Sequence, residues 1–246
     1  MMNYDWNWWL FFEMVADTDA TWFDMLMSGL GWTLLTSACA WLIAFFLGSF
    51  MGIARSSRHQ GVVVMGNAFV EIFRNIPLIV QFFIWYFVLP EIIAPLKQLS
   101  LSLDPTQFQF FISVACLGLF TAARVAEQVR SGISSIPPGQ YRAGQALGLG
   151  NFQIYRFVLL PMAYRTILPP MTSEMMSLIK NTSVALTIGL TELTFRAREM
   201  GEFTFSFFEA YIAATLTYIV VALAVSRLMN RLESFLAVPG FLGASK

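Results

Sequence analysis

The polar residues that could carry chemistry in this chain lie inside long apolar runs. One group lies between residues 166 and 190, where polar side chains recur about one helical turn apart: Ser173, Glu174, Ser177, Lys180 and Asn181. This spacing places them on one face of a helix. Lys180 could attract a carboxylate and Glu174 an ammonium group, as residues lining a path for a charged solute would. The other interpretation, structural ion pairing between helices, stays open.

Two further apolar runs contain charges, which cost on the order of 3 kcal/mol at the centre of a bilayer and need partners or water. Glu71 and Arg74 lie one turn apart, and we favour a mutual ion pair over a role in a solute path. Pro77 permits a bend just beyond them. Arg124 could bind a solute carboxylate through two hydrogen bonds, pair with Glu127, or extend to the lipid headgroups.

The sequence predicts no catalytic residue and no metal site. Cys39 and Cys116 lie in apolar runs and are interpreted as small buried hydrophobes, while His59 stands in a polar loop without ligand companions. The chain has no G-x-x-x-x-G-K-[ST] loop, so we expect it neither to bind nor to hydrolyse ATP. A formal net charge of zero gives no basic patch for nucleic acid.

Composition places the chain in a membrane. Hydrophobic residues make up 57% of it and charged residues 12%, against roughly a quarter charged in a soluble domain. An apolar helix of about 20 residues crosses the hydrocarbon core. We therefore predict an all-α, polytopic transmembrane protein with spans at about 27–54, 61–89, 107–129, 166–190 and 207–225.

The distribution of Lys and Arg predicts an orientation. Ten of the 15 lie near the exits of the first, third and fifth spans, and three lie on the opposite side. Positive loops stay in the cytoplasm, so the N-terminus is predicted outside and the C-terminus inside. The expected parts are an N-terminal segment (1–26) at the outer interface, a transmembrane domain (27–230) with a cytoplasmic loop (130–165), and a cytoplasmic tail (231–246).

Small residues mark two places for close contact. Gly48-x-x-x-Gly52 in the first span would let another helix approach, although chance also explains a glycine pair in a membrane helix. In the cytoplasmic loop, Pro137 to Gly139 should end one helix. Short helices are then expected over 140–147, stopped by Gly148 and Gly150, and over 152–160, ending at Pro161. Such an ordered surface rich in small residues suits docking of another protein.

This loop resembles a motif of the permeases of binding-protein-dependent ATP-binding-cassette (ABC) importers: Glu-Ala-Ala, three residues, Gly, nine residues, Ile, any residue, Leu-Pro. The corresponding residues here are Arg142-Ala143-Gly144, Gly148, Val158 and Leu160-Pro161. The spacing is reproduced throughout. The departures are Arg142 in place of Glu, Gly144 in place of the second Ala, and Val158 in place of Ile.

Three other segments are similar to the polar amino acid branch of that family, nearest to permeases of glutamate/aspartate importers. They are 71–78, 126–133 and Lys180 to Ser183. The resemblance covers about residues 27–230. It implies the five-helix, MetI-like core of type I importer permeases and import of amino acids, acidic ones above all, across the bacterial inner membrane. The N-terminus would then be periplasmic.

The resemblance also implies partners. The residues that it assigns to coupling with an ATPase are Gly139, Gln140, Arg142, Ala143, Gly144, Ala146, Leu147, Gly148, Leu160 and Pro161. The expected assembly contains a second permease, a paralogue that would form a heterodimer, together with two ATPase subunits, a periplasmic solute-binding protein and membrane lipid. ATP and Mg²⁺ would be bound by the ATPase alone. The alternative function is an ion-coupled secondary transporter, against which stands the absence of an internal repeat.

Overall fold

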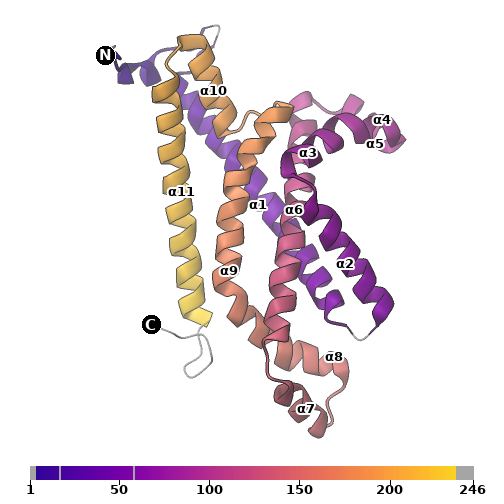
Figure 1. Ribbon diagram of the computed structural model, residues 1–246. Helices are drawn as coiled ribbons and strands as arrows, with labels where there is room; N and C mark the ends of the chain where they lie inside the picture. The colour runs from indigo at the N-terminus through magenta and orange to yellow at the C-terminus, as the bar shows by residue number, and fades with distance from the viewer. Residues whose placement is uncertain (1–3, 17, 58, 237–246) are drawn as a thin grey trace. The chain divides into compact units, whose positions relative to one another are not determined.

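The computed structural model describes residues 4–16, 18–57 and 59–236, and within these ranges the regular structure is helical, with one isolated bridge between Met14 and Thr21. The all-α prediction is therefore confirmed. The elements are η1 (Trp8–Phe12), α1 (Trp22–Arg55), α2 (Gln60–Asn75), α3 (Leu78–Phe83), η2 (Ile84–Val88), α4 (Leu89–Ile92), α5 (Ala94–Ser102), α6 (Pro105–Ser134), α7 (Pro138–Ala146), α8 (Asn151–Ile154), η3 (Tyr155–Leu159), α9 (Leu160–Asn181), η4 (Thr182–Ile188), α10 (Leu193–Thr204) and α11 (Phe207–Leu236) (Figure 1).

Three helices of the described chain, α1, α6 and α11, are long and apolar enough to cross a membrane. Each contains one predicted span and extends beyond it. The predicted span 61–89 is interrupted between α2 and α3, where Pro77 has no backbone N–H to donate. It is a fourth candidate span only if α2 and the bent helical segment from Leu78 to Ile92 are counted together as one membrane crossing.

The predicted span 166–190 is not among these helices. Its α-helix, α9, ends at Asn181 and continues as the 3-10 turn η4, and it carries two internal prolines besides Glu174 and Lys180. The count of five spans is therefore not confirmed for the described residues. The predicted tail has its first residues in α11, while 237–246 lie outside the described residues.

Contacts divide the chain into two units. The first comprises residues 1–40, 78–117 and 178–223. Its core joins Leu10 of the N-terminal segment and Trp22 of α1 to Met200 of α10 and Ala210 of α11. The N-terminal segment lies against the start of α11 (Figure 1), where Tyr4 Oη donates to Glu209 Oε2 at 2.5 Å and the Asn7 N–H to Oε1 at 2.9 Å. The N-terminal segment is thus bound to α11 by hydrogen bonds and packs in one core with α1, α10 and α11.

The second unit comprises residues 41–77, 118–177 and 224–246. Here Gly48 and Gly52 of α1 face α6, confirming the predicted close packing. A Cβ added at Gly48 would lie 2.6 Å from Val125 Cβ, and one at Gly52 would lie 2.7 Å from Val129 Cβ. Since real Cβ atoms do not approach that closely, only glycine permits this contact.

The loop between α6 and α9 forms two helical pieces, as predicted, but with one difference. The first is α7, which begins at Pro138, where a missing N–H costs nothing. The second was expected to end at Pro161. Instead α8 continues through the π-helical turn η3 directly into α9. A π turn changes the backbone hydrogen bonding just ahead of Pro161, which has no N–H to donate, so the helix passes the proline.

Candidate functional site

Helix α7 has a defined end. Gly148 has a φ of 77°, and its N–H donates to Gln145 O at 2.9 Å, while the Leu149 N–H donates to Gly144 O at 3.1 Å. These two bonds form a Schellman motif, in which the left-handed residue is normally glycine. The sequence prediction that Gly148 stops this helix is confirmed.

The same helix is held against α8. Gly144 is buried on Ile154, and an added Cβ would lie 2.9 Å from Ile154 Cγ1. Tyr141 Oη donates to Asn151 Oδ1 at 2.5 Å, and Gln153 Oε1 accepts from the Gly150 N–H at 2.9 Å. The contact with Ile154 explains why this chain carries glycine where the family motif has a second alanine.

Most residues that the resemblance assigns to coupling lie on the outside of this loop. Exposed are Gly139, Gln140, Arg142, Ala143, Ala146, Leu147, Gly148 and Pro161, while Gly144 is buried and Leu160 half-buried. Leu147 is 79% exposed, which is unusual for a leucine held in a defined turn. The loop therefore presents a preformed helix with an open outer face.

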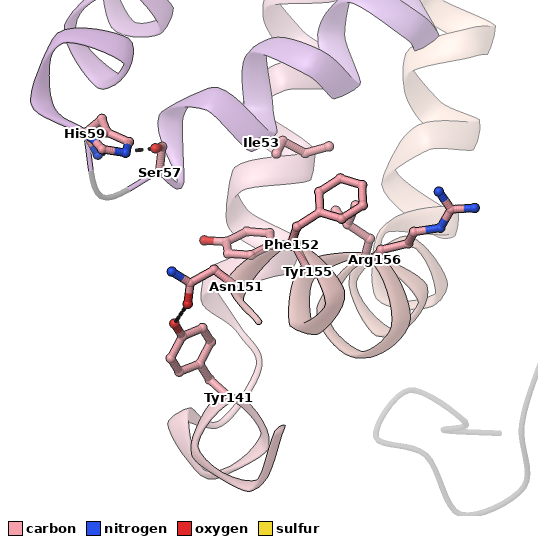
Figure 2. A pocket seen from close by; sticks show the side chains of 9 residues that line it. Ile53, Ser57, His59, Tyr141, Asn151, Phe152, Tyr155 and Arg156 are labelled. Carbon is pink, nitrogen blue, oxygen red and sulfur yellow. Dashed lines mark hydrogen bonds between the residues drawn. The ribbon is translucent and has the colours of Figure 1, made fainter. Parts of the chain in front are cut away.

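The loop is also tied to the end of α1. Tyr155 Oη donates to Ser56 O at 2.8 Å. Beside this bond lies a cavity of about 550 Å³. Figure 2 shows the side chains around it, which come from the end of α1 and the turn after it, from α7, and from α8 to η3, including Ile53, Ser57, His59, Tyr141, Asn151, Phe152, Tyr155 and Arg156.

Arg124 and Glu174 form an ion pair between α6 and α9, which is the structural pairing between helices that the sequence left open, although the sequence did not indicate Arg124 as the partner. Arg124 Nε lies 2.5 Å from Glu174 Oε2 and Nη2 lies 3.2 Å from Oε1, so the contact is bidentate. The Glu174 side chain is 8% exposed and that of Arg124 43%. Arg124 thus pairs across from α6 to α9 rather than with Glu127, and Glu174 already has a cationic partner.

Glu127 is the centre of a second charge cluster. Arg55 Nη1 lies 2.8 Å from Glu127 Oε2, and Arg74 Nη1 lies 3.6 Å from the same oxygen. Arg55 is 7% exposed, and its Nε donates to Asn67 Oδ1 at 2.8 Å. The favoured pair of Arg74 with Glu71 is not found among the ion pairs of the described residues; Arg74 reaches the carboxylate on α6 instead.

The rest of the predicted polar face lies toward the end of α9. Lys180 is exposed, and Ser177 and Asn181 are half-buried. Within the described part of the chain, Lys180 has no carboxylate partner, so its ammonium group is available to another molecule. The described residues include no group of three or more His, Cys, Asp or Glu side chains that could hold a metal ion.

Comparison with known proteins gives concordant results. Residues 44–238 match the model of the family described as "Binding-protein-dependent transport system inner membrane component". The chain is 45% identical to the glutamate/aspartate import permease protein GltJ of Escherichia coli K12, covering 98% of this chain and 99% of that protein. It is 32% identical to the probable glutamine ABC transporter permease protein GlnM of Bacillus subtilis 168, over 86% and 93% of the two chains. A crystal structure of an amino acid ABC transporter with histidines matches with a TM-score of 0.74 and 28% sequence identity, and the match covers 87% of this chain and 94% of that one.

Proposed function

The chain belongs to the family of binding-protein-dependent transport system inner membrane components, and from this we infer the place of each of its parts in an importer. It is a membrane permease subunit of an ABC importer for amino acids, and it is not itself an enzyme. Such permeases work with an ATPase and a binding protein.

We propose that α7 transmits movement of the ATPase to the permease. The observation that carries this is the exposure of eight of the ten candidate coupling residues, seven of them on α7 or in the turn that ends it and the eighth, Pro161, on α9. The end of α7 and its inner face are fixed. A preformed helix loses little conformational entropy on docking. Because Tyr155 connects this loop to the end of α1, displacement of α7 would be passed to a membrane helix. Transport requires that the two states of the ATPase bind α7 differently.

We propose acidic amino acids as the substrates. The permease GltJ, which is 45% identical, bears glutamate and aspartate in its name. Arg124 offers a cationic group whose side chain is 43% exposed and whose orientation Glu174 fixes. A guanidinium held on one edge can still receive a carboxylate on its other edge. Lys180, exposed on α9, is a separate cationic candidate for attracting such a substrate.

The orientation and assembly follow the sequence prediction. We propose a periplasmic N-terminus, a cytoplasmic C-terminus and α7 on the cytoplasmic side. A paralogous permease would complete a heterodimer, and two ATPase subunits would bind ATP and Mg²⁺. A solute-binding protein would deliver the amino acid from the periplasm. The exposed faces of α11, which is scarcely buried in this single chain, are available to lipid or to the second permease.

Purification of the native complex from membranes, followed by reconstitution, tests this function. We expect an ATPase subunit to be isolated with the chain, and uptake of radiolabelled glutamate to stop without ATP but to continue with a proton uncoupler. The opposite pattern would establish the ion-coupled secondary transporter. Competition by aspartate but not by glutamine would support the proposed substrate class.

The role of Arg124 is tested by Arg124→Gln beside Arg231→Gln, an exposed arginine outside the charged pairs of the described residues. Arg124→Gln should raise the concentration of glutamate needed for half-maximal uptake by about tenfold or more, since a charge-assisted bond is lost. Uptake in the Arg231→Gln variant should be unchanged. If both variants take up glutamate as the wild type does, Arg124 is a structural partner of Glu174 only.

A further inference from the structure

The cavity beside α7 and Arg156, which lines it, have no occupant assigned by the proposed function. We propose that they form a second docking site for the ATPase, which receives an apolar side chain of that subunit with carboxylates next to it. The inference rests on the proposed function, because that function supplies the ATPase as the partner. It adds the chemistry of the partner's surface, which must be acidic.

The first support is charge. From residue 131 to residue 173 the chain contains Arg142, Arg156 and Arg165 and not one Asp or Glu. All three arginines are exposed, and within the described residues none has a carboxylate partner. Elsewhere in the described chain, six cations do form ion pairs with carboxylates: Arg55, Arg74, Lys97, Arg124, Arg196 and Arg198. Exposed charges of one sign along a segment favour a partner of the opposite sign and accelerate its encounter, and Arg156 of this segment lines the cavity.

The second support is the cavity itself. Its walls combine apolar surfaces from Ile53, Phe152 and Leu160 with the rings of Tyr141 and Tyr155. Arg156 and His59 also line it, and in Figure 2 the Arg156 guanidinium extends on the side away from His59. Phe152 is 73% exposed, which is costly for a phenylalanine in water. An apolar group inserted there would cover it.

The position of the cavity identifies the occupant. Tyr141, one of its walls, belongs to α7, which we propose docks on the ATPase. The site is therefore continuous with that interface, and a protein surface that grips the outer face of α7 would extend over the cavity. A buried apolar anchor surrounded by polar contacts is the common arrangement of strong interface sites. A side chain inserted there would contact α1, α7 and α8 together and would help to move them as one.

Charge reversal tests the first support. The tagged permease complex would be purified from native membranes carrying wild type, Arg156→Glu or Arg231→Glu. Arg156 lines the cavity, whereas Arg231 is exposed near the end of α11 and, by the proposed orientation, lies on the same side of the membrane. We expect the wild type to lose its ATPase as NaCl rises, and Arg156→Glu to retain it at least about tenfold more weakly. Arg231→Glu should behave as wild type. Unchanged retention by Arg156→Glu, or equal loss in both variants, would overturn an acidic partner surface.

Filling the cavity tests the second support. Ser57→Phe places a ring inside it, while Gln60→Phe adds the same ring three residues further on, at an exposed position that does not line the cavity. Phe152→Ala removes an exposed wall with little effect on the fold. We expect Ser57→Phe and Phe152→Ala to retain about tenfold less ATPase than Gln60→Phe, with equal thermal stability of the isolated permease. Full retention by both, or loss of a bound phospholipid in mass spectra without loss of ATPase, would overturn the proposed occupant. A wild-type complex isolated without any ATPase would instead refute the proposed function.

Discussion

Replacement of Gly148 is the sharpest test of the coupling helix, because its effect should come from backbone conformation alone. Gly148 has a φ of 77°, and no atom lies within 4 Å of a Cβ added there. Alanine would therefore meet no clash and would bear only the cost of the left-handed region, about 1–2 kcal/mol. Asparagine tolerates that region and should cost less, whereas the β-branched valine should cost more.

The consequence for function follows from the length of α7. A helix of nine residues is marginal by itself, so its end motif has a large share in keeping it formed. A cost of about 1–2 kcal/mol lowers the ratio of formed to frayed helix by roughly 5- to 30-fold. If the formed helix is the state that the ATPase binds, the apparent affinity falls as the formed fraction falls.

The assay is ATP hydrolysis of the reconstituted complex, stimulated by the liganded binding protein, together with the initial rate of uptake. We expect activity to decrease in the order Gly148→Asn, Gly148→Ala, Gly148→Val. Gly61→Ala is the matched control, since it also meets no atom within 4 Å but lies at an ordinary helical position outside the candidate coupling residues. Loss of coupling in Gly61→Ala as large as in Gly148→Ala, or no difference between asparagine and alanine at 148, would refute the reasoning.

Three further predictions concern stability, measured by thermal or denaturant unfolding of the purified chain in detergent. Glu127→Gln should lower the free energy of unfolding by about 2 kcal/mol, since it leaves the buried Arg55 without a carboxylate. Glu91→Gln should lower it by less than about 1 kcal/mol, because both Glu91 and its partner Lys97 are exposed. Gly48→Ala should destabilise by about 1–3 kcal/mol through overpacking against α6, and an equal effect of Gly31→Ala, which meets no atom, would contradict this. Burial raises the pKa of the Glu192 carboxyl, although hydrogen bonds from backbone N–H groups and hydroxyls act to lower it. The contribution of Glu192 to the free energy of unfolding is therefore full below the unfolded-state pKa of about 4.3 and is lost as the pH rises through the folded-state pKa. Glu192→Gln should reduce this loss of stability with rising pH.

Features encoded by local spacing were predictable from the sequence. Gly148 was expected to stop a helix because glycine alone favours left-handed backbone, and the Schellman motif confirms this. The packing of Gly48 and Gly52 followed from small residues one turn apart, and α6 fills that space. Such patterns need no knowledge of which helix is the neighbour.

The partners of the charged residues were not predictable. Sequence spacing offered Glu71 for Arg74 and Glu127 for Arg124, because both acids lie one turn away. The structure pairs these arginines with carboxylates on other helices instead. Contacts between helices far apart in sequence depend on how the helices pack. The spacing of residues within one helix does not show which other helix lies against it.

These pairs leave the predicted orientation as it is, because the orientation follows the count of Lys and Arg, to which acidic residues contribute little. Lys97, Arg196 and Arg198, the cations expected outside, each lie within 2.8 Å of a carboxylate. Arg124 is paired with Glu174, while Arg55 and Arg74 share the one carboxylate of Glu127. The described arginines left without a carboxylate include Arg142, Arg156 and Arg165, all in the loop that we propose is cytoplasmic. These arginines count toward the proposed orientation, and their exposed charge also makes the loop attractive to an acidic partner, so orientation and docking depend on the same residues.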